Sequence, residues 1–379
     1  MSLRILSSAN VESISASFSP LDLQCLMAQV FHAISCSGVA GVGAGISNVQ
    51  TPHRTTVETE NHRILFMPAR LGPLPSAGSG DTQLTGHGTS IKIVSAPKRP
   101  DPRGLPGTTL VMDEATGGVK AVVNARTLTA LRNSAGSLLS TRLIAKRIPR
   151  RIVAFGAGNQ ILSHLDLHLR FFPQVERCTI INRSINERVD CLVTRLSQAF
   201  GQVRFSPLAG DSSAKVEEAV NSADLIICAT SSTTPLFPSS WVKSGTHIVL
   251  IGSYTPQMQE VDGDLIGRAN QSKGLLVDSR EACIKEAGEL INAGLRQDDL
   301  LEIGRILPMD HSGELDIQAL KARLESGLQD SGPQIPDFKG PVTLFKSVGI
   351  GLQDVAIGAA VVLKAEELGI GYLIDDYDA

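Results

Sequence analysis

Residues 151–160 read RIVAFGAGNQ, a short apolar run that ends in a glycine turn and passes directly into a helical pattern at 159–171. In such a strand–turn–helix unit the first glycine permits a tight turn, and the second lets the main chain approach a pyrophosphate. The helix that follows directs unpaired N–H groups at the anion. The stretch therefore predicts the opening of a Rossmann domain that binds a dinucleotide, and a glycine turn that serves only close packing is the alternative.

Short apolar segments alternate with helical patterns after this turn. We expect strands at 177–181, 203–206, 224–229, 246–251 and 274–278, and helices at 185–200 and 213–221. Short strands separated by helices indicate a parallel sheet that is covered on both faces. A longer helical pattern begins at 127 and ends before Pro149, where it leads into the sheet.

The first 125 residues show a different pattern of apolar and turn-forming residues. A helical pattern covers 21–36, strand-like segments lie at 63–68, 89–95 and 108–113, and a hairpin turn is indicated at 115–118. Stretches rich in glycine and serine at 37–48 and 71–88 are typical of loops. These patterns predict a mixed, largely antiparallel α+β domain.

The carboxyl-terminal part is predicted to hold a helix at 314–326, a loop at 330–337 and a final helix from 347 that packs back on the first domain. The fold class is thus α/β: a doubly wound parallel-sheet (Rossmann) domain joined to a mixed α+β domain. We place the first domain at 1–129 plus 350–379 and the Rossmann domain at 130–349.

Composition limits the classes of partner. The chain has 379 residues, a formal net charge of −3 and 4% aromatic residues, which argues against a nucleic acid or another polyanion. None of the six cysteines forms a CxxC pair, so the spacing indicates neither a zinc site nor a dithiol motif, and we expect no metal. The start of the chain lacks a signal-peptide pattern, and no apolar run approaches the roughly 20 residues of a membrane span. We expect a cytoplasmic protein that acts on a small molecule and not on a membrane.

The end of the second Rossmann strand bears on the choice of cofactor. Folds that select NAD usually carry Asp or Glu there to hold the ribose 2′-hydroxyl, whereas this chain has Asn182, Arg183 and Ser184. Arg183 can pair with a 2′-phosphate, and its two neighbours can donate hydrogen bonds to it. The sequence therefore favours NADP(H) over NAD(H), with a solvated surface arginine as the alternative reading of Arg183.

Phrases that follow one another in a characteristic order resemble the ornithine cyclodeaminase/μ-crystallin family from about residue 50 to 360. They are His53-Arg54, LFMPA at 65–69, IKIVS at 91–95, GLPGTTLVMD at 104–113, TALRNSAGS at 129–137, FGAGNQ at 155–160, INRS at 181–184, ICATSSTTPLF at 227–237, IGSYTP at 251–256, VDSREACIKEAGEL at 277–290 and TLFKSVGIGLQD at 343–354. The resemblance implies a homodimer in which the first domain binds substrate and forms the dimer, while the middle of the chain binds the cofactor.

Members of this family move hydride between a nicotinamide and the α-carbon of an amino or imino acid, so the resemblance implies a fixed set of cations for the substrate carboxylate. By motif position these are Arg54, Lys92 and Arg132, with Met67 beside them. Lysine inside an apolar strand is also expected to be buried with a partner, Arg54 could be a plain surface charge, and Arg132 could contact substrate or cofactor phosphate. The expected cofactor-binding residues are Gly156, Ala157, Gly158, Asn159, Gln160, Asn182, Arg183, Ser184, Ala229, Thr230, Ser231, Gly252 and Ser253.

Two positions depart from the cyclodeaminases of the family. The aspartate that acts there as the proposed base corresponds to Tyr254, and a helping glutamate corresponds to Leu65. A phenol, with an ordinary pKa of about 10, is a poor base at neutral pH. The departures therefore favour reduction of an imine over ring-forming deamination.

The first-choice function is NADPH-dependent reduction of an α-imino acid, either a ketimine or a cyclic imine carboxylate, by an NAD(P)-dependent oxidoreductase acting on C–N bonds. Lys92 is the first candidate for the proton donor and Tyr254 the second. The alternatives are an ornithine or lysine cyclodeaminase, an amino-acid synthase of the same family, and a non-catalytic protein that binds NADPH or another small ligand.

Five further residues have a plain structural role or a family position to consider. A loop histidine such as His87 is expected at the surface, and Glu286 and Glu289 are expected on the solvated face of a helix. Lys346 and Ser347 precede the final helix, and their family position implies that they line the nicotinamide site.

Overall fold

The structure is a computed structural model that describes residues 2–36, 48–73, 86–99, 104–326, 335 and 340–377. It divides into two compact units, of which unit 1 comprises Met1–Arg132, Met309–Gln318 and Ile350–Ala379, and unit 2 comprises Asn133–Pro308 and Ala319–Gly349. The loops expected at 37–48, 71–88 and 330–337 lie mostly outside the described residues, although 71–73 and 86–88 are described. The expected α/β fold class is confirmed, because one unit is built on a parallel sheet and the other on a mixed sheet.

Unit 1 is organised around a mixed sheet that has eight strands among the described residues. In spatial order these are β16 (Tyr372–Ile374), β1 (Leu3–Leu6), β7 (Val119–Asn124), β6 (Gly107–Met112), β5 (Gly88–Pro97), β4 (His62–Leu71) and β2 (Val49–Gln50), with β3 (Thr55–Glu58) also paired with β4. Every pairing is antiparallel except that of β1 with β7. The hairpin between β6 and β7 occupies the turn that the sequence predicts at 115–118.

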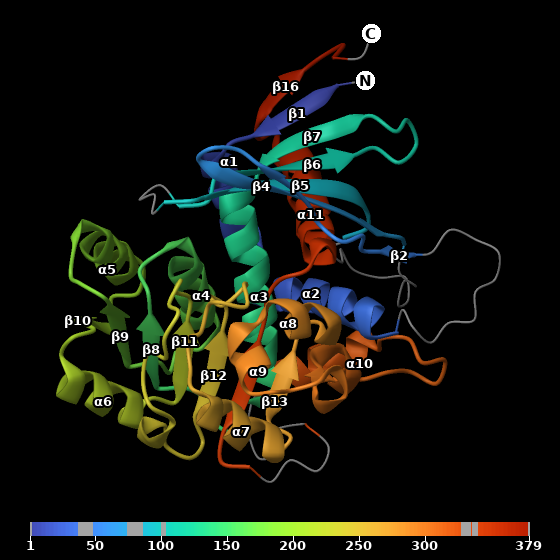
Figure 1. The fold of residues 1–379 in the computed structure, drawn as a ribbon. Helices are drawn as coiled ribbons and strands as arrows, with labels where there is room; N and C mark the ends of the chain where they lie inside the picture. The colour runs from blue at the N-terminus through green and yellow to red at the C-terminus, as the bar shows by residue number, and fades with distance from the viewer. Residues whose placement is uncertain are drawn as a thin grey trace. The chain divides into compact units, whose positions relative to one another are not determined.

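Three helices of unit 1 are α1 (Ser8–Ser17), α2 (Pro20–Cys36) and α11 (Gly351–Leu368). Helix α11 lies along one face of the sheet, where it packs on β4, β5 and β6 (Figure 1). The sequence predicts α2 almost to the residue, but it does not reveal α1, whose amino end is closed by reciprocal bonds between Ser7 and Asn10. The expected start of the last helix at 347 is wrong, since the chain stays non-helical until Gly351 and passes through Gly349 at a φ of +82°.

Unit 2 contains a sheet in which all pairings among the described residues are parallel. Its spatial order is β10 (Arg204–Ala209), β9 (Arg177–Asn182), β8 (Arg151–Phe155), β11 (Leu225–Cys228), β12 (His247–Leu250), β15 (Thr343–Lys346), β13 (Leu275–Val277) and β14 (Leu301–Glu302). The order reverses at β8, because β9 and β10 lie on one side of it and β11 and β12 on the other. A crevice for a dinucleotide forms at such a switch point, outside the carboxyl ends of the strands.

Helices connect most of these strands. They are α3 (Ala125–Ile144), in which the division between the units falls, α4 (Asn159–Phe171), α5 (Glu187–Ala199), α6 (Ser213–Ser222), α7 (Gly263–Gln271), α8 (Arg280–Glu286), α9 (Gly288–Asn292) and α10 (Ile317–Glu325). The sequence places the first strand and helix of this unit to the residue, because each strand is a short apolar run bounded by polar turns. It gives no expectation of β15, which inserts between β12 and β13 from a part of the chain near the carboxyl end.

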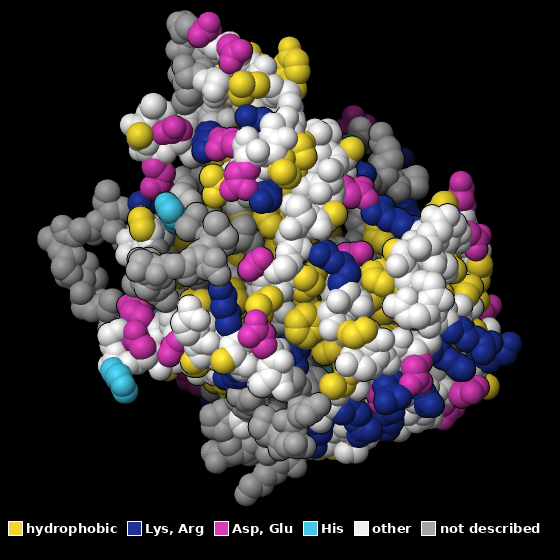
Figure 2. All heavy atoms as spheres, turned by 180° about the vertical axis from the view of Figure 1, so that it is seen from behind, with side chains coloured by type: hydrophobic (Ala, Val, Ile, Leu, Met, Phe, Trp, Pro, Cys, Tyr) yellow, Lys and Arg dark blue, Asp and Glu magenta, His cyan; other side chains and the backbone are white. Residues whose placement is uncertain are grey.

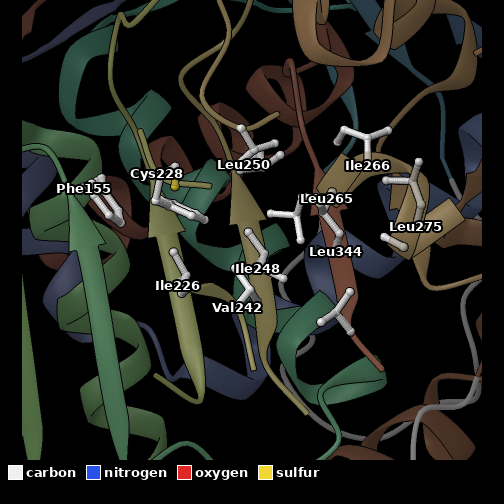
Figure 3. Packing of buried hydrophobic residues seen from close by; sticks show 14 of the residues in the cluster. Phe155, Ile226, Cys228, Val242, Ile248, Leu250, Leu265, Ile266, Leu275 and Leu344 are labelled. Carbon is white, nitrogen blue, oxygen red and sulfur yellow. The ribbon is translucent and has the colours of Figure 1, made fainter. Parts of the chain in front are cut away.

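The core of unit 2 is built largely of aliphatic side chains from the central strands and from the helices packed on them. Figure 3 shows Ile226 and Ile248 on neighbouring strands, with Leu265 and Leu344 packed beside them, and all four are fully buried. Strands that are apolar at successive positions are expected when helices cover both faces of a sheet. This packing fixes the carboxyl ends of β8, β11, β12 and β15 along one edge.

Three buried histidines of unit 2 face hydroxyl groups on α3. Ser137 Oγ lies 2.9 Å from His164 Nε2, Thr141 Oγ1 lies 3.1 Å from His168 Nε2, and Ser140 Oγ lies 3.4 Å from His247 Nε2. Burial lowers the pKa of His164 to about 4 and the pKa values of His168 and His247 to about 3. The histidines are therefore neutral hydrogen-bonding groups of the interior at physiological pH.

The surface carries both signs of charge. On the face shown in Figure 2, Lys and Arg side chains are intermingled with Asp and Glu side chains. Within the described ranges, every helix is too short or too polar to span a membrane. The six cysteines are free thiols, four of them buried.

Candidate functional site

The glycine turn after β8 is held closely between two neighbouring strands. Gly156 has a φ of +111°, its N–H donates to Ile181 O at 2.8 Å, and a Cβ on it would lie 2.9 Å from Ala229 O. An L side chain would therefore be strained by conformation and by contact. Ile161, which replaces the third glycine of the usual motif, is fully buried beneath the turn, so packing accommodates this departure.

The turn presents an open helix end. Gly158 is the N-cap of the 13-residue helix α4 and makes no side-chain cap, and a Cβ built on Gly158 would meet no atom within 4 Å. The first N–H groups of α4 thus lack a side-chain cap, and the helix end carries a partial positive charge. A pyrophosphate fits such an end, so the residues present are compatible with a bound dinucleotide.

Residues of α3 support this helix end from within unit 2. Asn133 Nδ2 donates to Gln160 Oε1 at 3.1 Å, and Ser134 Oγ lies 2.8 Å from Ser163 Oγ. These bonds fix the first turn of α4 against α3. Ala157 is buried and Asn159 is exposed, so the expected contacts of this segment to a cofactor rest on its main chain as much as on its side chains.

The end of β9 forms an exposed polar turn. Asn182 Nδ2 donates to Ser184 O at 2.8 Å, which closes the turn, while Arg183 and Ser184 are exposed. No carboxylate occurs at 182–184, so nothing in this turn opposes an additional phosphate. The preference for the phosphorylated cofactor that these three residue types favour stays a prediction.

The ends of β11 and β12 supply the other expected cofactor contacts. Ala229 and Thr230 are half-buried and Ser231 is exposed, whereas Gly252 and Ser253 are buried. The Ser253 hydroxyl donates to Met258 O at 2.8 Å and accepts from Gly288 N at 3.1 Å. Its hydroxyl is therefore engaged inside the protein.

Tyr254 is half-buried and follows directly in the same loop. It therefore belongs to unit 2, together with the expected cofactor contacts, whereas Lys92 belongs to unit 1. The two candidate proton donors are thus carried by different units.

The expected substrate cations lie in unit 1, where two of them share a carboxylate. Lys92, on β5, donates to Asp354 Oδ2 at 2.6 Å, and Arg132 Nε donates to Asp354 Oδ1 at 3.3 Å. Arg132 also donates to Gln353 Oε1 at 2.7 Å. Lys92 and Arg132 are each 3% exposed, which confirms that the strand lysine is buried with a partner.

The charges around Lys92 explain its acid–base properties. Burial lowers the pKa of Lys92; Asp354 opposes this, and the positive charges of Arg132 and Arg54 lower it further. Arg54 is half-buried, and its charge acts on Lys92. A lysine in this setting gives up its proton more readily than an exposed one, and an arriving carboxylate would find two arginines beside it.

Strand register brings Met67 into the same neighbourhood. Met67 on β4 and Thr109 on β6 are the residues directly opposite Lys92 in the sheet. Directly opposed side chains lie on one face of a sheet, so Met67 flanks Lys92, and its role beside the substrate stays a prediction. Leu65, two positions earlier on β4, faces the same side.

Sequence reasoning missed the acid that organises these cations. Asp354 and Gln353 are each 1% exposed and lie on α11, inside the otherwise apolar stretch GLQDVAIGAAVVLK. A lone carboxylate in such a helix is a usable signal, because a buried acid requires a cation. The pattern does not say which cation, since Lys92 is 262 residues away.

The expectation that Glu289 lies on a solvated face is wrong. Its side chain is 0% exposed, and Glu289 Oε1 lies 2.9 Å from Lys346 Nζ. Lys346 ends a central strand and is itself fully buried, so it requires a counter-charge from the helices at that edge. Glu286 is half-buried and His87 is exposed, the latter as expected.

A doubly wound parallel sheet with a glycine turn on its first strand, together with a mixed-sheet unit that buries a Lys–Asp–Arg cluster, defines a Rossmann-type α/β protein. The family model for the ornithine cyclodeaminase/mu-crystallin family matches residues 38–368. The chain therefore belongs to the ornithine cyclodeaminase/mu-crystallin family.

Two named relatives and one solved structure are similar to the chain over most of its length. The chain is 27% identical over 332 residues to a delta(1)-pyrroline-2-carboxylate reductase of Bacillus cereus, covering 86% of this chain and 89% of the relative. It is 28% identical over 316 residues to the ketimine reductase mu-crystallin of Rattus norvegicus, covering 83% and 84%. The solved delta(1)-pyrroline-2-carboxylate reductase of Thermococcus litoralis, in complex with NADH and L-proline, has the same fold, with a TM-score of 0.73, 21% identity and coverage of 97% and 99%.

Proposed function

We propose that this chain is an NADPH-dependent reductase of α-imino acids, which converts a ketimine or a cyclic imine carboxylate to the amino acid. The observation that carries the proposal is the buried Lys92–Asp354–Arg132 cluster, in which a lysine of lowered pKa lies beside cations suited to a carboxylate. Relatives named as reductases of pyrroline-2-carboxylate and of ketimines support it.

The chemistry requires a hydride at the imine carbon and a proton at the imine nitrogen. A bound nicotinamide dinucleotide supplies the hydride. Arg132 and Arg54 hold the substrate carboxylate, and arginine can do so through two parallel hydrogen bonds. Lys92 donates the proton to the imine nitrogen, which makes the carbon more electrophilic, and solvent returns a proton to Lys92 afterwards. Asp354 keeps the lysine oriented and favours its charged form.

Tyr254 and Leu65 direct the proposal toward reduction. A cyclodeaminase requires a base that handles the amine and activates water, and neither a phenol nor an alkyl side chain does this at neutral pH. Reduction has no such requirement. Tyr254 remains the second candidate for the proton donor.

We further propose that NADPH is preferred to NADH. The exposed turn formed by Asn182, Arg183 and Ser184 supports this preference, because it offers a guanidinium and hydrogen-bond donors without a competing carboxylate. The solved relatives do not support this preference, since NADH and NAD⁺ are the cofactors named in their complexes.

We also infer a homodimer in the cytosol. The dimeric state is supported by a solved archaeal alanine dehydrogenase that is described as a dimer and shares the fold at a TM-score of 0.70. A reducing compartment is supported by the six free thiols.

The decisive experiment follows NADPH absorbance against a panel of cyclic and linear imino acids that includes pyrroline-2-carboxylate and piperideine-2-carboxylate. A parallel arm offers ornithine or lysine with NAD⁺ and measures ammonia. Oxidation of NADPH by an imine supports the proposal. Ammonia release from ornithine contradicts it in favour of cyclodeamination, and NADPH binding without turnover of any imine contradicts it in favour of a binding protein.

A further inference from the structure

A group of fully buried ionisable side chains lies at the carboxyl edge of the sheet in unit 2, and the proposed reaction gives it no role. Lys346 is the last residue of β15, opposite Leu250 of β12 and Val277 of β13. Its ammonium lies 2.9 Å from Glu289, and a second carboxylate, that of Glu260, is also 0% exposed. Charges this deeply buried are costly unless each one has partners, so their placement requires an explanation.

Glu260 joins the loops that follow β11 and β12. Its Oε1 accepts from Thr230 N at 2.7 Å and from Thr230 Oγ1 at 2.9 Å, while its Oε2 accepts from Gly252 N at 2.7 Å. One carboxylate therefore fixes the main chain beyond both strand ends. Figure 3 shows Cys228 and Leu250 beside the tips of these two strands, immediately before the loops.

The position of Gly252 shows how tight this arrangement is. A Cβ on Gly252 would lie 2.0 Å from Thr230 O and 2.4 Å from Glu260 Oε1. Real Cβ atoms do not approach so closely, so glycine is required for the carboxylate and the two loops to meet. We call the contact of Glu260 with Thr230 and Gly252 the clamp, and it depends on a specific residue at each of these three positions.

Lys346 balances the charge of the clamp. Burial raises the pKa of Glu260 and the charge of Glu289 raises it further, so that it lies above its ordinary value, while Lys346 and the N–H groups of Thr230 and Gly252 limit the rise. Burial acts in the opposite direction on Lys346, yet Glu289 and Glu260 raise its pKa overall. The lysine is thus charged at neutral pH and supports the ionised form of Glu260, which is the form that can accept three hydrogen bonds.

Strand order indicates which part of a dinucleotide these loops serve. The pyrophosphate belongs at the turn after β8, and the turn at the end of β9 lies on the adenosine side of the switch point. Strands β11 and β12 lie on the opposite side of β8. Because all these strands are parallel, their carboxyl ends share one edge, and the loops after β11 and β12 fall to the nicotinamide half.

We propose that Glu260 is a positioning residue for the nicotinamide half of the cofactor, holding the main chain at Thr230 and Gly252 in its binding conformation while Lys346 compensates the buried charge. This inference rests on the proposed binding of NADPH. It assigns Glu260 no direct contact with substrate or cofactor. A preformed loop lowers the ordering cost of binding, so loosening it should weaken only the interactions that the loop makes.

The test compares two ligands on Glu260→Gln. The amide nitrogen of glutamine would face an N–H donor of either Thr230 or Gly252, so one end of the clamp is lost. We expect the Kd of NADPH to rise about tenfold or more, while the Kd of 2′-phospho-ADP-ribose, which lacks the nicotinamide, changes less than about twofold. Isothermal titration of both ligands measures this split without any turnover.

Asp262→Asn is the matched control. Asp262 also accepts two main-chain bonds in unit 2, from Ser239 N at 2.7 Å and Leu265 N at 2.8 Å, but it ties α7 to a different segment. We expect Asp262→Asn to lower the melting temperature and to leave the ratio of the Kd of NADPH to the Kd of 2′-phospho-ADP-ribose unchanged. Glu260→Asp, which keeps the charge on a shorter stem, should give a smaller loss with the same selectivity, and it replaces Glu260→Gln if the latter does not fold.

Equal losses for both ligands, or unchanged NADPH affinity, would overturn the proposal. Wild-type protein that binds NADPH but reduces no imine contradicts the proposed function, while the same titrations still decide the role of Glu260. Wild-type protein that binds neither ligand contradicts both.

Discussion

Replacing Asp354 by asparagine tests whether one buried carboxylate organises the cations of unit 1. The side chains of Lys92 and Asp354 are 4% and 1% exposed and their charged atoms are 2.6 Å apart, with Arg132 on the other carboxylate oxygen. Asparagine keeps the shape but not the charge, and its amide group directs N–H donors at one of the two cations. Removing one partner of a buried ion pair costs about 3–5 kcal/mol, because the remaining charge stays buried.

The assay is denaturant unfolding, with hydrogen exchange to localise the loss to β5 and α11. We expect Asp354→Asn to lower the free energy of unfolding of unit 1 by about 3–5 kcal/mol, or its melting temperature by on the order of 10 °C. Glu366→Gln is the control on the same helix. Glu366 lies 3.1 Å from Lys120, but the side chains are 36% and 40% exposed, and such a pair contributes less than about 1 kcal/mol.

The same substitution should shift the pH dependence of imine reduction. Asp354 raises the pKa of Lys92, so its removal lowers that pKa further. Because the protonated lysine is the proposed proton donor, activity should be lost as pH rises through its pKa, and the falling limb of kcat/KM should move to lower pH. A stability loss within about 1 kcal/mol of the Glu366→Gln control would refute the argument from burial, and an unmoved pH profile would refute the role of Asp354 in tuning Lys92.

Three further predictions concern the donor, the cofactor and the interior. Lys92→Met should keep NADPH binding in titrations but lose imine turnover, and unchanged turnover would exclude Lys92 from the mechanism. Arg183→Ala should raise the Kd of NADPH about tenfold or more and that of NADH far less; equal losses would contradict the assignment. The pKa values of His164, His168 and His247 in the folded protein lie below the ordinary value of 6.5. As the pH falls, these histidines are therefore protonated in the unfolded chain before they are protonated in the folded protein. Each histidine should therefore reduce the free energy of unfolding by up to about 1.4 kcal/mol per pH unit between about pH 6.5 and its folded pKa, with a shallower slope for His247→Gln.

The Rossmann unit could be predicted from local pattern to a large extent. The strand at 151–155 and the helix at 159–171 match β8 and α4 in their bounds. Each is a continuous segment whose apolar residues, turn glycines and caps lie within a few positions of one another. The spacing of apolar residues and the turn residues that end an element are properties of neighbouring residues, so the sequence contains them directly.

The elements that the sequence did not reveal depend on distant parts of the chain. Strand β15 is four residues long and is stabilised by pairing with β12 and β13 on either side. The strands at the edge of the other sheet, β1 and β16, come from opposite ends of the chain. A short segment becomes a strand only when its partners are in place, and local pattern does not identify those partners.

The residues of the candidate site fall into the same two groups, those defined by local pattern and those that depend on distant parts of the chain. The sequence by itself determined the glycine turn at 156–160, the polar turn at 182–184 and the unusual lysine at position 92, because each is defined by residue types next to one another. Only the tertiary structure decided that Asp354 joins Lys92 to Arg132, that Glu289 is buried against Lys346, and that Glu260 ties Thr230 to Gly252. Buried charges select partners by proximity in the folded state, and a one-dimensional pattern carries no record of that distance.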